Sequence, residues 1–449
     1  MKRVLQYIDD NADEFVARVQ KLCRQPSVAA QGIGMAEAAA MVAEMLRRVD
    51  AEVRLVPTSG YPVVFGQIDG PAGGKTLGFY NHYDVQPPEP LELWKSEPFA
   101  AEIRDGKLYA RGVADNKANF VSRVCAVEAY QAVKGPLPLT VKFIVEGEEE
   151  IGSVHLKEFV CNHRDLVMCD GLIWETAYKN LSEQLVISLG LKGILYVELH
   201  AHGANTDLHS ANAAMVPSPT WRLVWALNTL KGPDDRVLIP GFYDDVRPAT
   251  PDEMALLEKM PLDEAGQKAA LGIDCFVNDL TGLPLKEKYL FQPTCNICGL
   301  GAGYTGEGLK TVLPNHAMCK IDFRLVPDQD PFKILDALRA HLDSLGFVDI
   351  EVRLIDGDWA QRTDPEAGIV KAVEASARKV YAKPPVIAPT MAGSGPGHTL
   401  CGELGIPSAG AGTGYYDSRS HAPNENIRLA DFIEGVKHIA VLLDEFAAY

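Results

Sequence analysis

A buried strand that runs directly into a cluster of carboxylates constrains this chain more than any other feature. Residues 139–145, Leu-Thr-Val-Lys-Phe-Ile-Val, are apolar and rich in β-branched side chains, which indicates a buried strand. Glu146, Gly147 and three further glutamates at 148–150 follow at once. In open α/β sheets, ligands bind beyond the carboxyl ends of the strands. An isolated Glu triplet is most simply a hydrated acidic turn, so other residues must show whether these carboxylates face a cation.

Polar residues recur at other predicted strand ends. His82 follows a strand expected at 76–80, and Asp170 follows one expected at 166–169. Asp115 precedes a helix expected from Lys117 to Val133, where it could serve simply as the helix N-cap. Together with the Glu triplet, these residues predict one shared site along the edge of a sheet.

Hydrophobic periodicity gives the expected domain organisation. We expect amphipathic helices at 5–22 and 35–49 and strands at 52–56 and 63–68. From about Leu191 the order becomes strand, helix, two strands, helix, strand, which is that of a ferredoxin-like unit. The predicted strands of this unit are 193–200, 294–300, 318–326 and 348–354, and its helices are 219–230 and 331–345. We therefore predict an α/β fold whose main domain, residues 1–190 and 363–449, has a mixed central sheet flanked by helices. An inserted ferredoxin-like α+β domain, residues 191–362, interrupts it.

Composition excludes several function classes. A formal net charge of −17 argues against nucleic acid or an anionic membrane as a partner. No uncharged apolar run of about 18 residues appears, so we expect no membrane-spanning helix. The first ten residues lack the apolar core of a signal peptide, and nine scattered cysteines fit reduced thiols, so the cytoplasm is the expected compartment. Cys295 and Cys298 have the spacing of a zinc knuckle but no second pair, and we expect them to be strand residues.

The candidate ligands are imidazoles and carboxylates without a thiolate: His82, Asp115, Glu150, Asp170 and His421. Such ligands suit zinc first, with manganese or cobalt as alternatives. Five ligands fit two divalent metal ions, about 3.5–4 Å apart, that share one carboxylate. Asp84 could accept the second N–H of His82 and fix its tautomer. Glu149 would then remain beside a metal-bound water, as a general base.

Four segments resemble motifs of the di-zinc metallopeptidase family of carnosinases, cytosolic non-specific dipeptidases, aminoacylases and glutamate carboxypeptidases. Residues 81–87, Asn-His-Tyr-Asp-Val-Gln-Pro, resemble its first metal motif, and 111–117, Arg-Gly-Val-Ala-Asp-Asn-Lys, its bridging-Asp motif. Residues 146–153 resemble the motif that carries the base and a ligand, and 421–427 resemble the last His motif. The resemblance covers essentially the whole chain, including the inserted domain, which is a lid in this family. One departure is Asn116, where the family commonly has a second Asp.

The resemblance also implies roles for individual residues. One metal ion would be bound by His82, Asp115 and Asp170, although Glu175 is close enough in sequence to replace Asp170. The second would be bound by Asp115, Glu150 and His421, with Glu149 as the catalytic base.

Further residues of the expected lid resemble substrate-binding positions of the family. His209 would stabilise the oxyanion, often from the partner subunit of a homodimer formed through the lid. Arg324 would bind the substrate carboxylate, together with the turn at Gly393 and Ser394. Without the resemblance, His209 is more simply a surface-turn histidine and Arg324 a strand-end arginine paired with an acid.

These observations lead to a functional hypothesis. We expect a metal-dependent hydrolase that cleaves the amide bond of a dipeptide or similar small substrate with a free carboxylate. An N-acyl-amino-acid deacylase, similar to acetylornithine deacetylase or succinyl-diaminopimelate desuccinylase, is the alternative with the same site. A non-catalytic binding protein on this fold and a phosphoesterase are weaker alternatives, because all five candidate ligands and the base are present and no Gly-rich phosphate loop is found.

Overall fold

The computed structural model of the protein describes residues 1–449, which divide into two compact units. Unit 1 comprises Met1–Gly190, Arg362–Pro389 and Pro396–Tyr449, and unit 2 comprises Leu191–Gln361 and Thr390–Gly395. Thr390–Gly395, which we expected in the main domain, thus belongs to unit 2. None of the helices is both long and apolar enough to cross a membrane.

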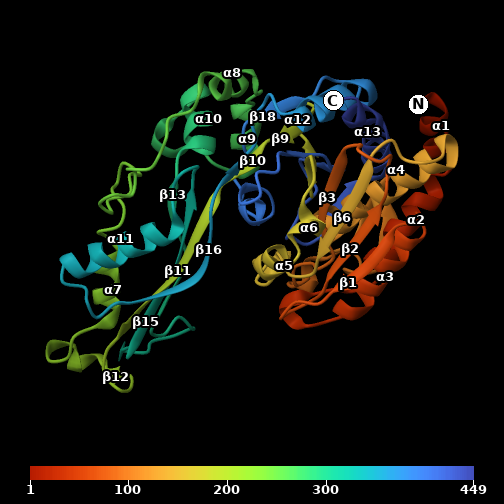
Figure 1. The fold of residues 1–449 in the computed structure, drawn as a ribbon. Helices are drawn as coiled ribbons and strands as arrows, with labels where there is room; N and C mark the ends of the chain where they lie inside the picture. Colours follow the sequence, from red (N-terminus) through yellow and green to blue (C-terminus); the bar gives the residue numbers. More distant parts are fainter. The chain divides into compact units, whose positions relative to one another are not determined.

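Unit 1 is built on a six-stranded mixed sheet (Figure 1), with the strand order β1-β2-β6-β3-β7-β19. The strands are β1 (Glu52–Val56), β2 (Val63–Ile68), β3 (Thr76–His82), β6 (Thr140–Glu146), β7 (Gly171–Trp174) and β19 (Ser408–Gly410). Strands β6, β3, β7 and β19 run parallel, whereas β1 and β2 are antiparallel to their neighbours. From Val141 on, every residue of β6 is buried, as expected for a strand that is covered on both faces.

Helices flank this sheet, and α13 packs against both α4 and α12 (Figure 1). The helices of unit 1 are α1 (Lys2–Asp10), α2 (Ala12–Cys23), α3 (Met35–Arg47), α4 (Ala118–Lys134), α5 (Leu156–Asn162), α6 (Arg164–Val167), α12 (Gly368–Val380) and α13 (Leu429–Ala448). The predicted α/β class with a mixed central sheet is therefore confirmed.

Short strands complete unit 1. One small sheet has the order β18-β9-β8-β20, and another has the order β21-β5-β4. Their bounds are β4 (Glu102–Arg104), β5 (Lys107–Tyr109), β8 (Tyr178–Lys179), β9 (Leu185–Ser188), β18 (Val386–Ala388), β20 (Gly414–Tyr415) and β21 (Asn426–Arg428). Strands β10 (Gly190–Leu191) and β17 (Gln361–Arg362) mark the two ends of the insertion.

Unit 2 has the ferredoxin-like architecture that the sequence predicts. Its antiparallel sheet has the order β13-β15-β11-β16, and α7 (Pro219–Leu227) and α11 (Pro331–Ser344) pack on it. The strands are β11 (Gly193–His202), β13 (Thr294–Ala302), β15 (His316–Leu325) and β16 (Glu351–Asp358). The connection between α7 and β13 contains α8 (Pro251–Lys259), α9 (Glu264–Leu271) and α10 (Gly282–Phe291), and a small hairpin pairs β12 (Leu208–His209) with β14 (Val312–Leu313).

Two predicted elements differ from the structure by more than their bounds, whereas the strand expected at 348–354 is only shifted, to Glu351–Asp358. The helix expected at 5–22 is interrupted at Asn11, whose side-chain amide donates to the carbonyl of Tyr7 and competes with the helical pattern. The strand expected at 166–169 is wrong: Leu166 and Val167 end helix α6, and the strand β7 begins only at Gly171. A short apolar run cannot be assigned to helix or strand by periodicity alone.

Candidate metal centre

Three parallel strands end at one edge of the sheet of unit 1 and place the first site residues. His82 is the last residue of β3 and pairs in register with Glu146, the last residue of β6. Glu149 and Glu150 lie in the short 3-10 turn that follows β6, and Glu175 directly follows Trp174, the end of β7. This is the sheet edge that the sequence analysis predicted for the site.

Asp115 comes from the segment that leads into α4. It lies in the π-helical turn Val113–Lys117 with a non-helical backbone (φ −128°, ψ 85°) and is followed by a cis peptide bond to Asn116. The buried carboxylate of Glu425 accepts hydrogen bonds from the backbone N–H groups of Gly112, Ala114 and Asp115, at 2.8–3.1 Å. Glu425 also pairs with buried Arg111 at 2.7 Å, and it thereby fixes the turn that presents Asp115.

Asp115 lies between two imidazoles. Its Oδ1 is 3.0 Å from Nε2 of His82, and its Oδ2 is 3.2 Å from Nε2 of His421. Each histidine has a second carboxylate: Glu175 Oε2 lies 3.5 Å from His82 Nε2, and Glu150 Oε2 lies 3.1 Å from His421 Nε2. The five side chains thus form two sets of three that share Asp115.

Asp84 contacts both His82 and the turn that carries Glu149 and Glu150. Nδ1 of His82 lies 3.0 Å from the carbonyl oxygen of Asp84 and 3.3 Å from its Oδ1. The Asp84 carboxylate also accepts the backbone N–H groups of Glu149 and Glu150, at 3.3 and 2.9 Å. Gln86, which the sequence analysis did not single out, donates to Oε2 of Glu150 at 2.9 Å.

Asp170 is not part of the cluster, and this ligand assignment is wrong. It immediately precedes β7, is exposed, and accepts the backbone N–H of Thr76 at the start of β3. Because β3 and β7 are parallel, Asp170 and His82 lie at opposite ends of the same strands. Glu175, the alternative left open by the sequence, occupies the position beside His82.

The electrostatics of the cluster follow from a surplus of carboxylates. Burial raises the pKa of Glu175 to about 8, and burial together with the charge of Glu175 raises the pKa of Glu149 well above its usual range. Hydrogen bonds to Asp115 and Glu150 raise the pKa of His421 to about 11. Burial opposes the ionisation of Asp115, but its bonds to His421 and His82 hold the pKa of Asp115 below its usual range. A cation in this cluster would relieve the repulsion among the acids.

The residues expected to bind substrate lie in unit 2. His209 is exposed in β12, where its Nδ1 accepts the N–H of Ala211. Arg324, in β15, donates from Nε to Asp322 at 3.1 Å. Gly393 accepts the N–H of Lys192, and the hydroxyl of Ser394 donates to the carbonyl of Gly193. Their roles toward a substrate remain predictions.

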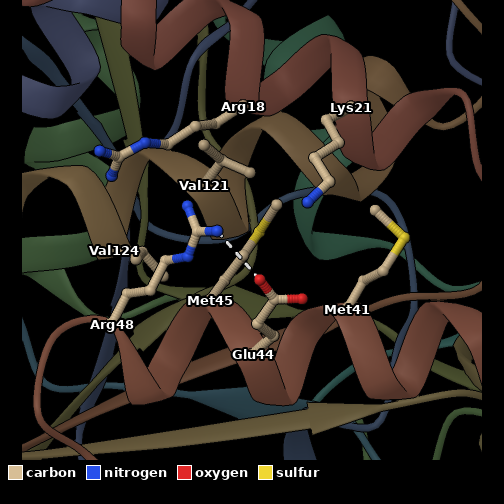
Figure 2. Close-up of a pocket in the computed structure, with 8 residues that line it drawn as sticks. All are labelled: Arg18, Lys21, Met41, Glu44, Met45, Arg48, Val121 and Val124. Carbon is tan, nitrogen blue, oxygen red and sulfur yellow. Dashed lines mark hydrogen bonds and ion pairs between the residues drawn. The ribbon is translucent and has the colours of Figure 1, made fainter.

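A pocket elsewhere in unit 1 contains none of these residues (Figure 2). It has a volume of about 20 Å³ and is lined by side chains of α2, α3 and α4 and by Arg48, which directly follows α3 and pairs with Glu44 at 2.9 Å. A space of this size holds about one water molecule and is too small to bind a substrate.

Comparison with known proteins identifies the family. The model of Peptidase family M20/M25/M40 matches residues 78–445, which span the cluster and all of unit 2. The chain is a member of this peptidase family. It is similar to the human Beta-Ala-His dipeptidase, with 29% identity over 374 residues that make up 77% of this chain and 72% of that protein. It is 28% identical to the Cys-Gly metallodipeptidase DUG1 of Candida albicans, over 96% of this chain and 94% of the relative.

A solved structure of the same family is similar over nearly the whole chain. The M20 family metallo-carboxypeptidase Sso-CP2 from Sulfolobus solfataricus has a TM-score of 0.93 and 38% identity, over 97% of this chain and 100% of that one. The M20 fold with a lid domain is therefore the fold of this chain, and unit 2 corresponds to the lid.

An M20 metallopeptidase implies metal ions, and the residues present fit them. Ligand atoms of His82, Asp115 and Glu150 all lie within 4.8 Å of one another. Oε2 of Glu175 is buried yet has no hydrogen-bond partner, which is costly for a carboxylate unless a cation binds it. Imidazole and carboxylate ligands are consistent with the predicted zinc, manganese or cobalt.

Proposed function

We propose that this M20 peptidase is a dipeptidase that hydrolyses small peptides with a free carboxylate, using two divalent metal ions. The observation that carries the proposal is the position of Asp115, each of whose oxygens contacts a different histidine that has its own second carboxylate. A shared carboxylate between two three-ligand sets is the arrangement that two metal ions about 3.5–4 Å apart require. His82, Asp115 and Glu175 would hold one ion, and Asp115, Glu150 and His421 the other.

Bound metal ions would polarise the scissile carbonyl and lower the pKa of the attacking water. Glu149 would take a proton from that water as its oxygen bonds to the carbonyl carbon. The same carboxyl would then give the proton to the leaving amine as the C–N bond breaks. The position of Glu149 supports this role, because it lies in the same short turn as the candidate ligand Glu150, shortly after the end of β6.

The choice of a dipeptide rests on the names of the relatives, two of which are dipeptidases. The similarity to Sso-CP2 favours a carboxypeptidase as the second candidate. The substrates of both reactions carry a free C-terminal carboxylate, and Arg324 would bind it. The N-acyl-amino-acid deacylase remains a third candidate, because it would use the same cluster.

One substrate screen separates these candidates. Chelator-treated protein would be assayed with free dipeptides, N-blocked dipeptides and N-acetyl amino acids, before and after zinc or manganese is restored. Metal-dependent cleavage confined to free dipeptides is the expected result. Cleavage of N-blocked dipeptides would favour the carboxypeptidase, and cleavage of only the acetylated compounds would favour the deacylase.

The assignment of the base is tested by Glu149→Gln. This variant should lose at least about 100-fold in kcat while it still binds metal, because general-base catalysis contributes about 10²–10⁴-fold. The matched control is Glu148→Gln, whose carboxylate contacts His155 and the N–H of Tyr61 instead of the cluster, and which should keep most of its kcat. Unchanged kcat in Glu149→Gln would contradict the assignment.

A further inference from the structure

A group of histidines lies on the face of the unit 2 sheet that is turned away from its core. Leu199 and Ala201 of β11 are buried in that core. Side chains alternate along a strand, so His200 and His202 share the opposite face. His316, the first residue of β15, lies directly across from His202 in the antiparallel register.

His316 contacts the imidazoles of both His200 and His202. Nδ1 of His200 is 2.9 Å from Nε2 of His316. The ring of His316 stacks on both neighbours, with centroids 4.9 Å from His202 and 5.2 Å from His200. His200 is buried, whereas the side chain of His202 is 60% exposed, and Nε2 of His202 lies 3.6 Å from Oε2 of the exposed Glu351. The ring of His202 can therefore turn toward the other two histidines once it releases this exposed pair.

The carboxylate of Glu198 determines which ring nitrogen of His200 carries the proton. Oε2 of Glu198 lies 3.0 Å from Nε2 of His200 and can only accept, so Nε2 carries the proton. The lone pair of neutral His200 is therefore on Nδ1, the atom directed at His316. Lys320 holds the other oxygen of Glu198 at 3.1 Å. A carboxylate that fixes a histidine tautomer from behind is the usual support of a metal-binding histidine.

We propose that His200, His202 and His316 bind a late first-row transition-metal ion, such as zinc or nickel, at a site that shares no residue with the candidate metal centre. Three imidazoles from two adjacent strands are a ligand set that these ions favour. Metal–nitrogen bonds of about 2.0–2.1 Å would require the nitrogens of His200 and His316, which now face each other at 2.9 Å, to separate slightly and turn toward a common ion. The ring of His202 would turn toward the same ion. The proposed hydrolysis uses none of these residues, so the ion would link β11 and β15 without entering the reaction.

The test uses the full chain in a background from which the catalytic ions are removed. In the double variant His82→Ala/His421→Ala, metal-free protein would be titrated with zinc against a chromophoric chelator. We expect one zinc ion per chain. Adding His200→Ala or His316→Ala should abolish this binding, and adding His163→Ala, which removes a histidine of unit 1, should leave it intact. Retention of the ion after His200 and His316 are replaced, or no binding in the background, would overturn the proposal.

A milder variant covers the case in which loss of a histidine unfolds unit 2. Glu198→Gln keeps all three imidazoles and should weaken zinc binding about 10- to 100-fold, the usual effect of removing a carboxylate behind a metal-binding histidine. Cobalt in place of zinc should give visible absorption bands in the background variant that disappear in His316→Ala. An unchanged zinc affinity in Glu198→Gln, or a cobalt spectrum independent of His316, would count against the site.

Discussion

Glu175 and Asp170 are five residues apart, yet they lie at opposite ends of one strand, and this difference gives a paired test. Glu175→Gln should lower the affinity for the ion next to His82, because it removes a charged ligand from a buried position. Asp170→Asn should leave metal affinity unchanged, because its carboxylate contacts only the start of β3. Metal content after dialysis and competition titration measure both. Equal loss in the two variants, or loss only in Asp170→Asn, would contradict the assignment.

Glu425 is a second residue whose importance the sequence does not reveal. In Glu425→Ala, buried Arg111 and three backbone N–H groups lose their partner, so the free energy of unfolding should fall by about 3–5 kcal/mol. Urea unfolding of metal-free protein measures this. Glu366→Ala, which breaks an exposed pair with Lys371, is the control and should cost less than about 1 kcal/mol. A similar small cost in both variants would show that Glu425 does not hold the Asp115 turn.

Among the helices, α13 contains a buried group that makes the fold sensitive to acid. Burial lowers the pKa of His438 to about 4, and its Nε2 lies 3.2 Å from the carbonyl of Val373 in α12. Between about pH 6.5 and pH 4 the unfolded chain binds a proton that the folded chain does not, so stability falls as the pH falls through this window.

The variant His438→Gln isolates this effect, because it cannot ionise but can still donate to Val373. Relative to this variant, the natural protein should lose up to about 3 kcal/mol of unfolding free energy between pH 7 and pH 4. Urea unfolding at a series of pH values measures the difference. A constant difference between the two proteins across this range would contradict the buried, neutral state of His438.

Elements with strong periodicity could be predicted from the sequence, and those that depend on tertiary contacts could not. Strands β1 and β2 agree with their predicted bounds, because alternation and turn residues define them locally. Because a strand was expected at 166–169, the carboxylate that follows a strand end was predicted to be Asp170. In the structure the strand is β7, and the carboxylate beside His82 after its end is Glu175. The role of Glu425 could not be predicted, since its partners at Gly112–Asp115 are more than 300 residues away in sequence.

At the scale of the whole molecule, the expected homodimer remains a proposal that light scattering can test. A mass of twice 48.9 kDa is the expected result, and a strict monomer would contradict it. If His209 acts on the partner subunit, mixing Glu149→Gln with His209→Ala chains should restore activity. With random pairing of equal amounts, about half of the dimers are mixed, and each mixed dimer has one complete site out of two. The expected recovery is therefore about a quarter of the natural activity. No recovery in verified mixed dimers would mean that His209 acts within its own subunit or not at all.

The assignment of Thr390–Gly395 to unit 2 bears on how this protein can be recombined with its relatives. The N–H of Lys192 donates to Gly393, and Ser394 donates to Gly193, so the start of the lid is joined to a segment 201 residues further along the chain. A chimera that exchanges only residues 191–361 would combine the strand of one parent with the turn of the other. Transfer of an intact lid between M20 enzymes would therefore require two separate pieces of the gene to be exchanged together.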